Sequence, residues 1–278
     1  LFDEYEETIL SIAREQTGYE FIDRAEPTDP WVVAKSLNIG STLGAWYRVS
    51  DHLSIAAAVR HLDATLSYAG GADYEFFGEI FGEAPLAEQD VAVDTVHRGS
   101  GIGQTYGLHY APTEDLDIGV QFETLTPIEL TYNTARDDTG LYPDGTKRRR
   151  DLPPKLSFGT TWAATPGFRT GFSINYYFNE MVDFGPKDTG GRVADDFVNG
   201  YEVSSFVEYQ LTDSIAVSTG YLYNRAGHTT RALTSLSWTL NHQVFGTGLT
   251  WQVNQSVDLT LGASFALYGK AKKKIVFG

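Results

Sequence analysis

Hydrophobic and polar residues alternate along five stretches of this chain, and the same short arrangement precedes each stretch. An aromatic residue is followed by five mostly polar or small residues and then by an apolar residue that begins the alternating run. The intervening residues are rich in Asp, Ser, Thr, Pro and Gly, which favour turns. Each copy therefore predicts a strand, a tight turn and a second strand. The five pairs are Tyr47/Leu53, Tyr110/Leu116, Trp162/Phe168, Tyr209/Ile215 and Trp251/Val257.

The length of the alternating runs indicates a membrane environment. Side chains of a strand point alternately to its two faces, so every second residue shares a face. In the third copy the apolar series runs from Phe168 to Phe178, whereas the other series begins with Arg169 and Gly171. Runs of about ten residues match a tilted membrane strand, while soluble strands average about five or six. The pattern predicts an all-β fold, a transmembrane antiparallel β-barrel, with a soluble β-sandwich as the alternative because it would alternate too.

We expect one β-barrel domain over residues 1–278, with its strands between residues 36 and 270. Residues 1–25 predict a short helix within a loop segment, because their apolar residues fall near one helical face. Turns within the hairpins are short and connections between them are long, as in bacterial outer-membrane barrels. The expected connections are 68–100, 134–153, 183–199 and 227–240. The ten expected strands are 36–49, 52–67, 101–112, 115–133, 154–164, 167–182, 200–211, 214–226, 241–253 and 256–270.

Composition narrows the class of protein further. No stretch approaches about eighteen consecutive apolar residues, which excludes a membrane-spanning helix. The net charge of −15 argues against a nucleic-acid partner, because phosphate contacts need a basic surface. The chain has no cysteine, and its six histidines are scattered without metal-ligand spacing or suitable catalytic partners. We therefore expect no enzymatic activity, no metal site and no cofactor.

Three motifs carry a resemblance to a known family. They are GIGQTYGLHYAP at 101–112, continuing with LDIG at 116–119; DLPPKLSFG at 151–159; and VEYQLTD at 207–213, followed by GYLY at 220–223. Over roughly residues 36–270 the chain resembles the FadL/TodX outer-membrane transporters of hydrophobic compounds. The resemblance implies a barrel of about fourteen strands whose lumen is plugged by an N-terminal hatch. With ten strands visible, we expect a partial barrel, its hatch and first strands lying upstream of residue 1, with closure of the ten strands among themselves as the alternative.

The resemblance also implies a function and a location. It implies passive uptake of long-chain fatty acids or other hydrophobic small molecules through the outer membrane of a diderm bacterium. The expected partners are a fatty acid or similar amphiphile, outer-membrane lipid and lipopolysaccharide, and we expect a monomer. Two alternatives stay open: a general polar porin, and a surface-exposed barrel that acts as an adhesin or antigen.

If the apolar series faces lipid, the opposite series lines the lumen and contains the candidate ligand-binding residues. Arg60 lies near mid-depth, where its guanidinium could bind a fatty carboxylate through two hydrogen bonds. The alternative is an ion pair between Arg60 and Glu123 or Glu208 that stabilises the barrel. Arg169 lies close to a short turn, which favours a structural role. The candidates are Arg60, His109, Gln121, Arg169, Asn175, Tyr177 and Glu208, with Glu123 and Asn224 on the same face.

Two features of the long connections are further candidates. An aromatic and apolar run in an otherwise acidic connection is predicted to line an external hydrophobic groove, with a small core of the loop itself as the alternative. The basic run 147–150 could meet lipopolysaccharide phosphates, with intramolecular ion pairs as the alternative. The residues of the predicted groove are Tyr74, Phe76, Phe77, Ile80 and Phe81.

Overall fold

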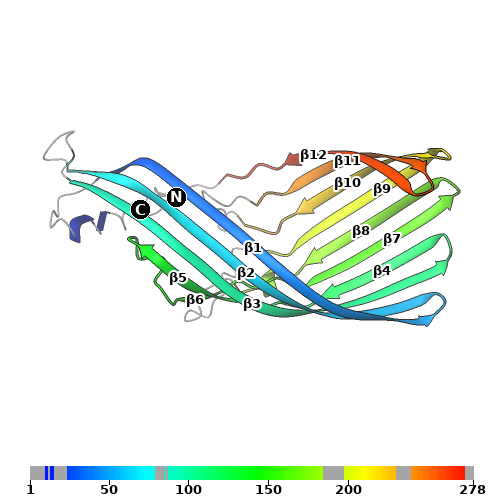
Figure 1. The fold of residues 1–278 in the computed structure, drawn as a ribbon, viewed down its shortest axis with the longest axis horizontal. Helices are drawn as coiled ribbons and strands as arrows, with labels where there is room; N and C mark the ends of the chain where they lie inside the picture. Colours follow the sequence, from blue (N-terminus) through cyan, green and yellow to red (C-terminus); the bar gives the residue numbers. More distant parts are fainter. Residues whose placement is uncertain are drawn as a thin grey trace.

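The protein is one antiparallel β-sheet, seen in a computed structural model that describes residues 10–11, 13–15, 24–78, 85, 87–183, 197–229 and 239–272 (Figure 1). Neighbouring strands along its main path follow the chain in the order β1-β2-β3-β4-β7-β8-β9-β10-β11-β12. The strands are β1 (Arg24–Ser50), β2 (Leu53–Phe77), β3 (Ala87–Thr113), β4 (Leu116–Glu123), β5 (Glu129–Asp137), β6 (Lys147–Arg149), β7 (Lys155–Thr165), β8 (Phe168–Tyr177), β9 (Gly200–Thr212), β10 (Ile215–Arg225), β11 (His242–Asn254) and β12 (Val257–Tyr268), with a short 3₁₀ helix η2 (Asn179–Met181) after β8.

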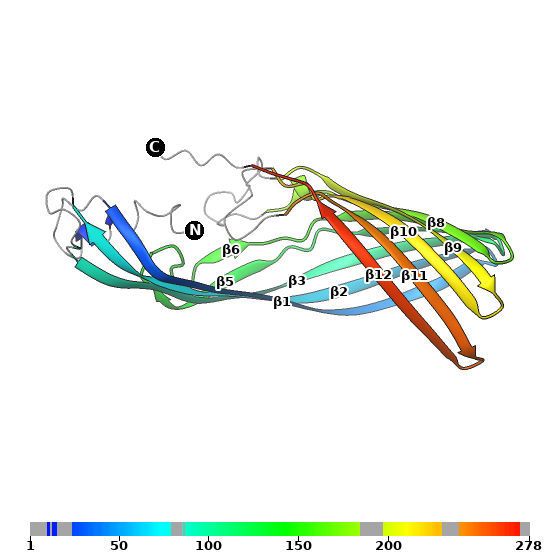
Figure 2. The same ribbon diagram turned by 90° about the horizontal axis from the view of Figure 1, so that it is seen from above.

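All five hairpins predicted from the repeated arrangement are present. They are β1–β2, β3–β4, β7–β8, β9–β10 and β11–β12, each joined by antiparallel pairing. The β7–β8 turn contains Gly167 at φ +92°, a backbone angle that glycine adopts without the steric penalty of a side chain. The sheet curves into an open trough with β1 and β12 at its two ends, and among the described residues these two strands are not paired with each other (Figure 2).

Three predicted strands are too short. β1, β2 and β3 contain 27, 25 and 27 residues, so much of the predicted connection 68–100 is strand. Gly70 and Gly71 lie in this predicted connection and pair with Val32 and Trp31 of β1. At Gly70 a Cβ atom would lie 2.8 Å from the Val32 side chain, so glycine here allows close approach rather than a turn.

The predicted strand 115–133 is wrong, because it is two strands. β4 ends at Glu123 and β5 begins at Glu129, after a connector that contains Pro127. β5 pairs with the same strand as β4, but farther along it, and β6 lies within the predicted connection 134–153. The connector passes so close to β3 that a Cβ atom at Gly101 would lie 2.3 Å from the Pro127 carbonyl oxygen.

The predicted helix is present over part of its range. Residues 10–11 and 13–15 are helical, and Leu10 and Ala13 are buried against Tyr74, Phe76 and Val91. The prediction is wrong at its C-terminal end, because β1 already begins at Arg24. The remaining positions of the predicted helix lie outside the described residues. No helix in the described part of the chain is long and apolar enough to cross a membrane.

The alternation predicted from the sequence gives the sheet two chemically different faces. The register aligns one row of small and polar residues from β2 to β10, which we call the polar face. The opposite side, the apolar face, carries exposed residues such as Leu43, Phe172 and Leu261. The row of the polar face is Ala56, Gly107, Gln121, Ser157, Asn175, Glu202 and Asn224.

Beyond Arg60 the two sides of β2 exchange character. On the side of the polar face, Leu62, Ala64 and Leu66 are buried beneath Ile128 and Leu130. On the opposite side, the strand continues with Asp63, Thr65 and Ser67. We call this outer part the extension, and it protrudes beyond the other strands (Figure 1). It consists of β2 from residue 62, the adjoining parts of β1 and β3, and β5–β6. Its inner side holds an apolar core, and its outer side carries the polar residues of β2 beside the exposed Ile39 and Leu37 of β1.

Candidate functional site

The polar face contains an open groove of about 590 Å³ across six strands. Three predicted lumen residues, His109, Gln121 and Asn175, lie together along it. The polar-face residues of the groove are Trp46, Ser54, Ala56, Gly107, His109, Gly119, Gln121, Ser157, Gly159, Ser173 and Asn175. The glycines and serines lie on this face because successive side chains of a strand point to opposite faces. Their side chains are small, so little of the groove is filled.

Arg60 is part of a charged cluster beside this groove. Its guanidinium lies 3.3 Å from the Glu123 carboxylate, and the Lys155 ammonium lies 2.6 Å from the other oxygen of the same carboxylate. Gln121 also donates a hydrogen bond of 3.0 Å to Glu123. Arg60 on β2 reaches β4 because its partner on the strand between them is Gly103, which has no side chain. The ion pair with Glu123, which the sequence offered as the alternative role of Arg60, is therefore present.

A second cluster surrounds Glu202, which sequence reasoning missed. Its carboxylate accepts hydrogen bonds from the Tyr177 hydroxyl at 2.7 Å, Asn224 at 3.0 Å and Asn175 at 3.3 Å. The structure thus brings the predicted residues Asn175 and Tyr177 to one carboxylate. The signal was available in the sequence, since Glu202 is six residues before Glu208 and lies on the same face of β9.

Arg169 and Glu208 lie apart from the charged clusters, toward the short β7–β8 turn. The guanidinium of Arg169 is 3.0 Å from the Glu208 carboxylate, and its side chain is 52% exposed. Arg169 is therefore paired within the sheet, and its structural role stays a prediction.

The predicted external groove is wrong in its placement. Tyr74, Phe76 and Phe77 belong to β2 rather than to a loop, and they are buried. Tyr74 and Phe76 pack with Leu10 and Ala13 in a small core, which is the alternative that the sequence left open. Ile80 and Phe81 lie outside the described residues.

An aromatic cluster on the inner side of the extension was also missed. The rings of His97 and Tyr132 stack at 3.7 Å, and those of Tyr68 and Tyr142 lie beside them. His97 is buried and its Nε2 atom has no hydrogen-bond partner. Burial, reinforced by the positive charges of Arg148 and Arg150, lowers the pKa of His97 to about 4. His97 therefore holds β3 against β5 as a neutral ring.

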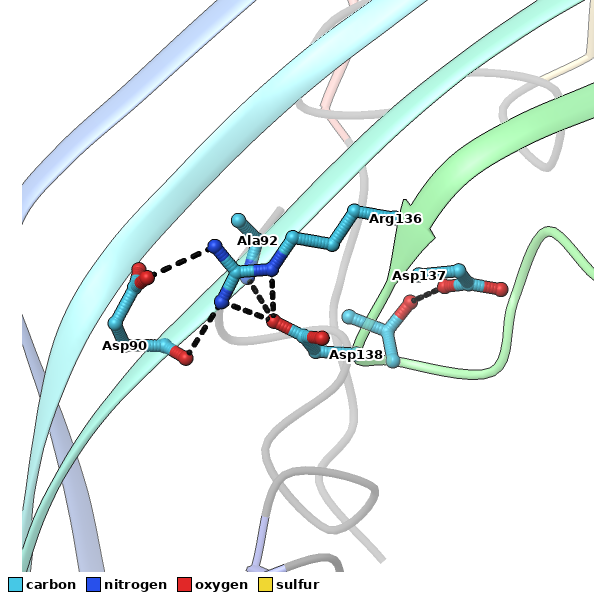
Figure 3. A network of polar contacts seen from close by, with 6 residues as sticks. Asp90, Ala92, Arg136, Asp137 and Asp138 are labelled. Atoms are coloured by element: carbon cyan, nitrogen blue, oxygen red, sulfur yellow. Dashed lines mark hydrogen bonds and ion pairs between the residues drawn. The ribbon is translucent and has the colours of Figure 1, made fainter.

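A salt-bridge network fixes the end of β5 to β3 (Figure 3). Figure 3 shows the Arg136 guanidinium between Asp90 and Asp138, at 2.9 Å from the first and 2.7 Å from the second. Asp138 also accepts a hydrogen bond from the Ala92 backbone N–H. Burial alone would raise the pKa of Asp138, but the hydrogen bonds from Arg136 and Ala92 hold it below its usual range.

Part of the basic run 147–150 is paired within the protein. Lys147 lies 2.8 Å from Glu129, and Arg149 donates two hydrogen bonds of 2.9 Å to Asp151, which is buried. Intramolecular pairing, the alternative to phosphate binding, is present for these two cations. Within the described part of the chain, no group of three or more His, Asp or Glu residues is placed to hold a metal ion.

Comparison with known proteins defines the class of fold. The chain superimposes on a Pseudomonas aeruginosa FadL homologue with a TM-score of 0.60 at 15% identity, over 84% of this chain and 60% of that one. It is similar to a mutant of the TodX monoaromatic hydrocarbon channel (TM-score 0.55, 15% identity, 84% and 65% covered). It is also similar to the CymD monoaromatic hydrocarbon channel (TM-score 0.52, 12% identity, 85% and 70% covered). The fold is therefore of the FadL/TodX type, as the sequence motifs predicted.

The likeness is one of structure rather than of sequence. No protein-family model matches the chain, and no curated protein matches its sequence. The chain spans 60% of the length of the P. aeruginosa FadL homologue.

Proposed function

We propose that the chain forms part of the wall of an outer-membrane channel for hydrophobic small molecules. The observation that carries this proposal is the reversal of the two sides of β2. Before the reversal, Ile55 and Val59 are 47% and 49% exposed on the apolar face. Beyond it, Leu62 and Leu66 are buried on the other side. Lipid favours exposed apolar side chains and water favours the opposite arrangement, so the reversal marks the outer edge of a bilayer.

The apolar face supports the same conclusion across the whole sheet. Soluble monomers rarely expose an apolar patch of more than a few hundred Å². Here large apolar side chains are exposed on every strand of the main path, as on the outward apolar band of membrane barrels. Examples are Leu43, Val59, Tyr106, Phe122, Phe158, Phe172, Val207, Tyr221, Phe245 and Leu261.

The polar face then lines the lumen. Five of its charged residues are paired, in Arg60–Glu123–Lys155 and Arg169–Glu208, which suits a wet interior. A barrel leaves no open sheet edge in hydrocarbon, because each unpaired backbone group there costs several kcal/mol. In this proposal the free edges of β1 and β12 are therefore paired within the membrane.

The chemical class of the ligand is proposed from the fold type and the lumen. Two of the similar structures are monoaromatic hydrocarbon channels and the third is a FadL homologue, which supports a hydrophobic cargo. Long-chain fatty acids are the more specific possibility, with Arg60 receiving the carboxylate. A fatty carboxylate would have to displace Glu123 from Arg60 or Lys155, so a neutral cargo fits the resting arrangement better.

The membrane part of the proposal is tested by charge substitutions on two adjacent residues of β12. Leu261 lies on the apolar face and is 73% exposed, while Thr260 lies on the polar face. Leu261→Lys should prevent heat-modifiable assembly in outer membranes, because lysine at the bilayer midplane costs about 2–4 kcal/mol. Thr260→Lys is the matched control and should assemble. Equal assembly of both variants would contradict the proposed orientation.

The transport part is tested with the protein assembled in outer membranes. Mass spectrometry of outer-membrane protein extracted in mild detergent should find a bound hydrophobic compound, and proteoliposomes should accumulate such compounds. Steady ion conductance in planar bilayers without uptake would instead identify a polar porin. Neither uptake nor conductance would favour the surface-barrel alternative.

A further inference from the structure

We propose that the connector between β4 and β5 is a fixed step on the lumen side of the sheet, and that Pro127 at its tip limits the width of the molecules that the channel admits. The step consists of residues 124–128. This role rests on the proposed function, because it requires the polar face to line the channel. It goes further by naming one residue that selects molecules by their width.

The step lies directly on β3, because β3 has glycine at the positions that the step crosses. Gly101 and Gly103 share the side of the polar face with Gly107. A Cβ atom at Gly101 would overlap the Pro127 carbonyl oxygen, and one at Gly103 would overlap the Thr126 hydroxyl. At Gly107, outside the step, a Cβ atom would make only ordinary contacts, the closest at 3.5 Å. The backbone of the step can therefore approach that of β3 closely.

Hydrogen bonds fix the step in this position. The backbones of Thr126 and Leu152 are joined by two hydrogen bonds of 3.0 and 3.1 Å. The Arg150 N–H donates a hydrogen bond of 2.9 Å to the Ile128 carbonyl oxygen. The Asp151 carboxylate, which is only 1% exposed, accepts a hydrogen bond of 3.0 Å from the Ile128 N–H. The step is thus tied to the segment that precedes β7 as well as seated on β3.

The side chains of the step alternate between the sheet and the lumen. Thr126 and Ile128 are 0% and 2% exposed, the first against Gly103 and the second in the core that contains Leu62. Pro127 lies between them and is exposed, so its ring points away from the sheet. The ring also restricts the backbone angle φ at this position. In the proposed channel, Pro127 is therefore a rigid tip that stands in the lumen.

The step and the charged cluster lie at the same level of the polar face. Gly103, which lies beneath Thr126, is the register partner of Arg60. Arg60 in turn reaches Glu123, and Lys155 lies on the same carboxylate. This level separates the extension from the groove of about 590 Å³. A molecule that moves from the extension to the groove has to pass both features, so the step narrows its path.

The test compares the uptake of two neutral alcohols of equal carbon number, the linear 1-decanol and the cage-shaped 1-adamantanol. Uptake is measured in cells that carry the protein in their outer membrane, after subtraction of the uptake by cells without it. Pro127→Trp enlarges the tip and should lower 1-adamantanol uptake about tenfold but 1-decanol uptake less than about twofold, because crowding an already narrow space penalises the wider molecule. Pro127→Ala removes the ring and should raise the ratio of 1-adamantanol to 1-decanol uptake.

Two matched controls separate width selection from general damage. Pro143→Trp changes another exposed proline, which lies between β5 and β6, and should leave the uptake ratio unchanged. Gly101→Ala should push the step away from β3 into the lumen and lower the ratio, whereas Gly107→Ala should not.

A ratio that stays unchanged in every Pro127 variant that still shows heat-modifiable assembly would overturn this role. An equal loss of both alcohols in Pro127→Trp would overturn it too. A wild-type protein that takes up neither alcohol would instead contradict the proposed function itself.

Discussion

The barrel part of the sheet and the extension are built from the same strands and yet are organised in opposite ways. In the barrel part of β2, Ile55 and Val59 are exposed on one side and small residues occupy the other. In the extension of the same strand, Leu62 and Leu66 are buried on that second side, and Asp63 and Thr65 occupy the first. The alternation continues without a break, so secondary structure alone does not distinguish the two regions. The side on which the apolar residues of β2 lie is the basis for proposing lipid around one region and water around the other.

The largest effect is expected in the core of the extension. Phe76 is fully buried among Leu10, Ala13 and Tyr74. Phe76→Ala should destabilise the extension by about 3–5 kcal/mol, because it removes buried area and leaves a cavity. Limited proteolysis should then cleave the extension while the barrel part stays protected. Loss of the whole barrel would contradict the separation of the two regions.

The next prediction compares two lysines on the same side of one strand. Ile55→Lys should destabilise the membrane-inserted protein by about 2–4 kcal/mol, because it puts a charge into lipid. Thr65→Lys lies ten residues farther along β2 and should change stability by less than about 0.5 kcal/mol, as for most surface substitutions. Urea unfolding in lipid vesicles measures both variants. An equal loss of unfolding free energy in the two variants would mean that both residues face the same solvent.

Attachment of β5 to β3 should weaken in acid. The pKa of His97 is lowered from its ordinary value of 6.5 to about 4, so the folded protein holds the neutral ring and the unfolded segment binds the proton first. The stabilisation is fully present above pH 6.5 and decreases as the pH falls toward 4. The loss reaches at most about 3 kcal/mol.

Hydrogen exchange of the β5 amides between pH 7 and pH 4, corrected for intrinsic rates, measures this pH dependence. His97→Phe keeps the stacked ring without a titratable group, so it should remove the dependence. A pH dependence that persists in His97→Phe would assign the effect to other groups.

The smallest effect is expected at the rim of the polar face. The Arg169 side chain is about half exposed beside Glu208, so Arg169→Gln should cost no more than about 1 kcal/mol. Urea unfolding and probe uptake should both remain close to those of the wild-type protein. A large loss of uptake with intact assembly would give Arg169 a direct role in transport.

The hairpins and the two faces of the sheet could be predicted from the sequence because they depend on residues close together in the chain. Turn residues between Trp162 and Phe168 and strict alternation along β8 fix a hairpin and its two sides. The same alternation identified His109, Gln121 and Asn175 as neighbours on one face before their contacts were known. The same alternation places Trp46 and Glu202 on the polar face, but neither was among the predicted site residues.

The remaining features depend on contacts between distant segments. β5 separates from β4 where the connector with Thr126 and Pro127 passes over Gly101 and Gly103, an approach that only the folded sheet reveals. The connection predicted at 68–100 is largely strand, because its residues pair with β1 and β5 and not only with their neighbours in sequence. Arg60 could be paired with Glu123 rather than Glu208 only when the register across Gly103 was known.

The central claim is that one side of β2 faces lipid up to the level of Val59 and water beyond His61. The chain contains no cysteine, so single cysteines can be introduced at 55, 57, 59, 61, 63, 65 and 67 and labelled in outer membranes with a membrane-impermeant maleimide. Protection is expected at 55, 57 and 59, reaction at 63, 65 and 67, and a transition at 61. Uniform reaction along the whole series would contradict this orientation of β2.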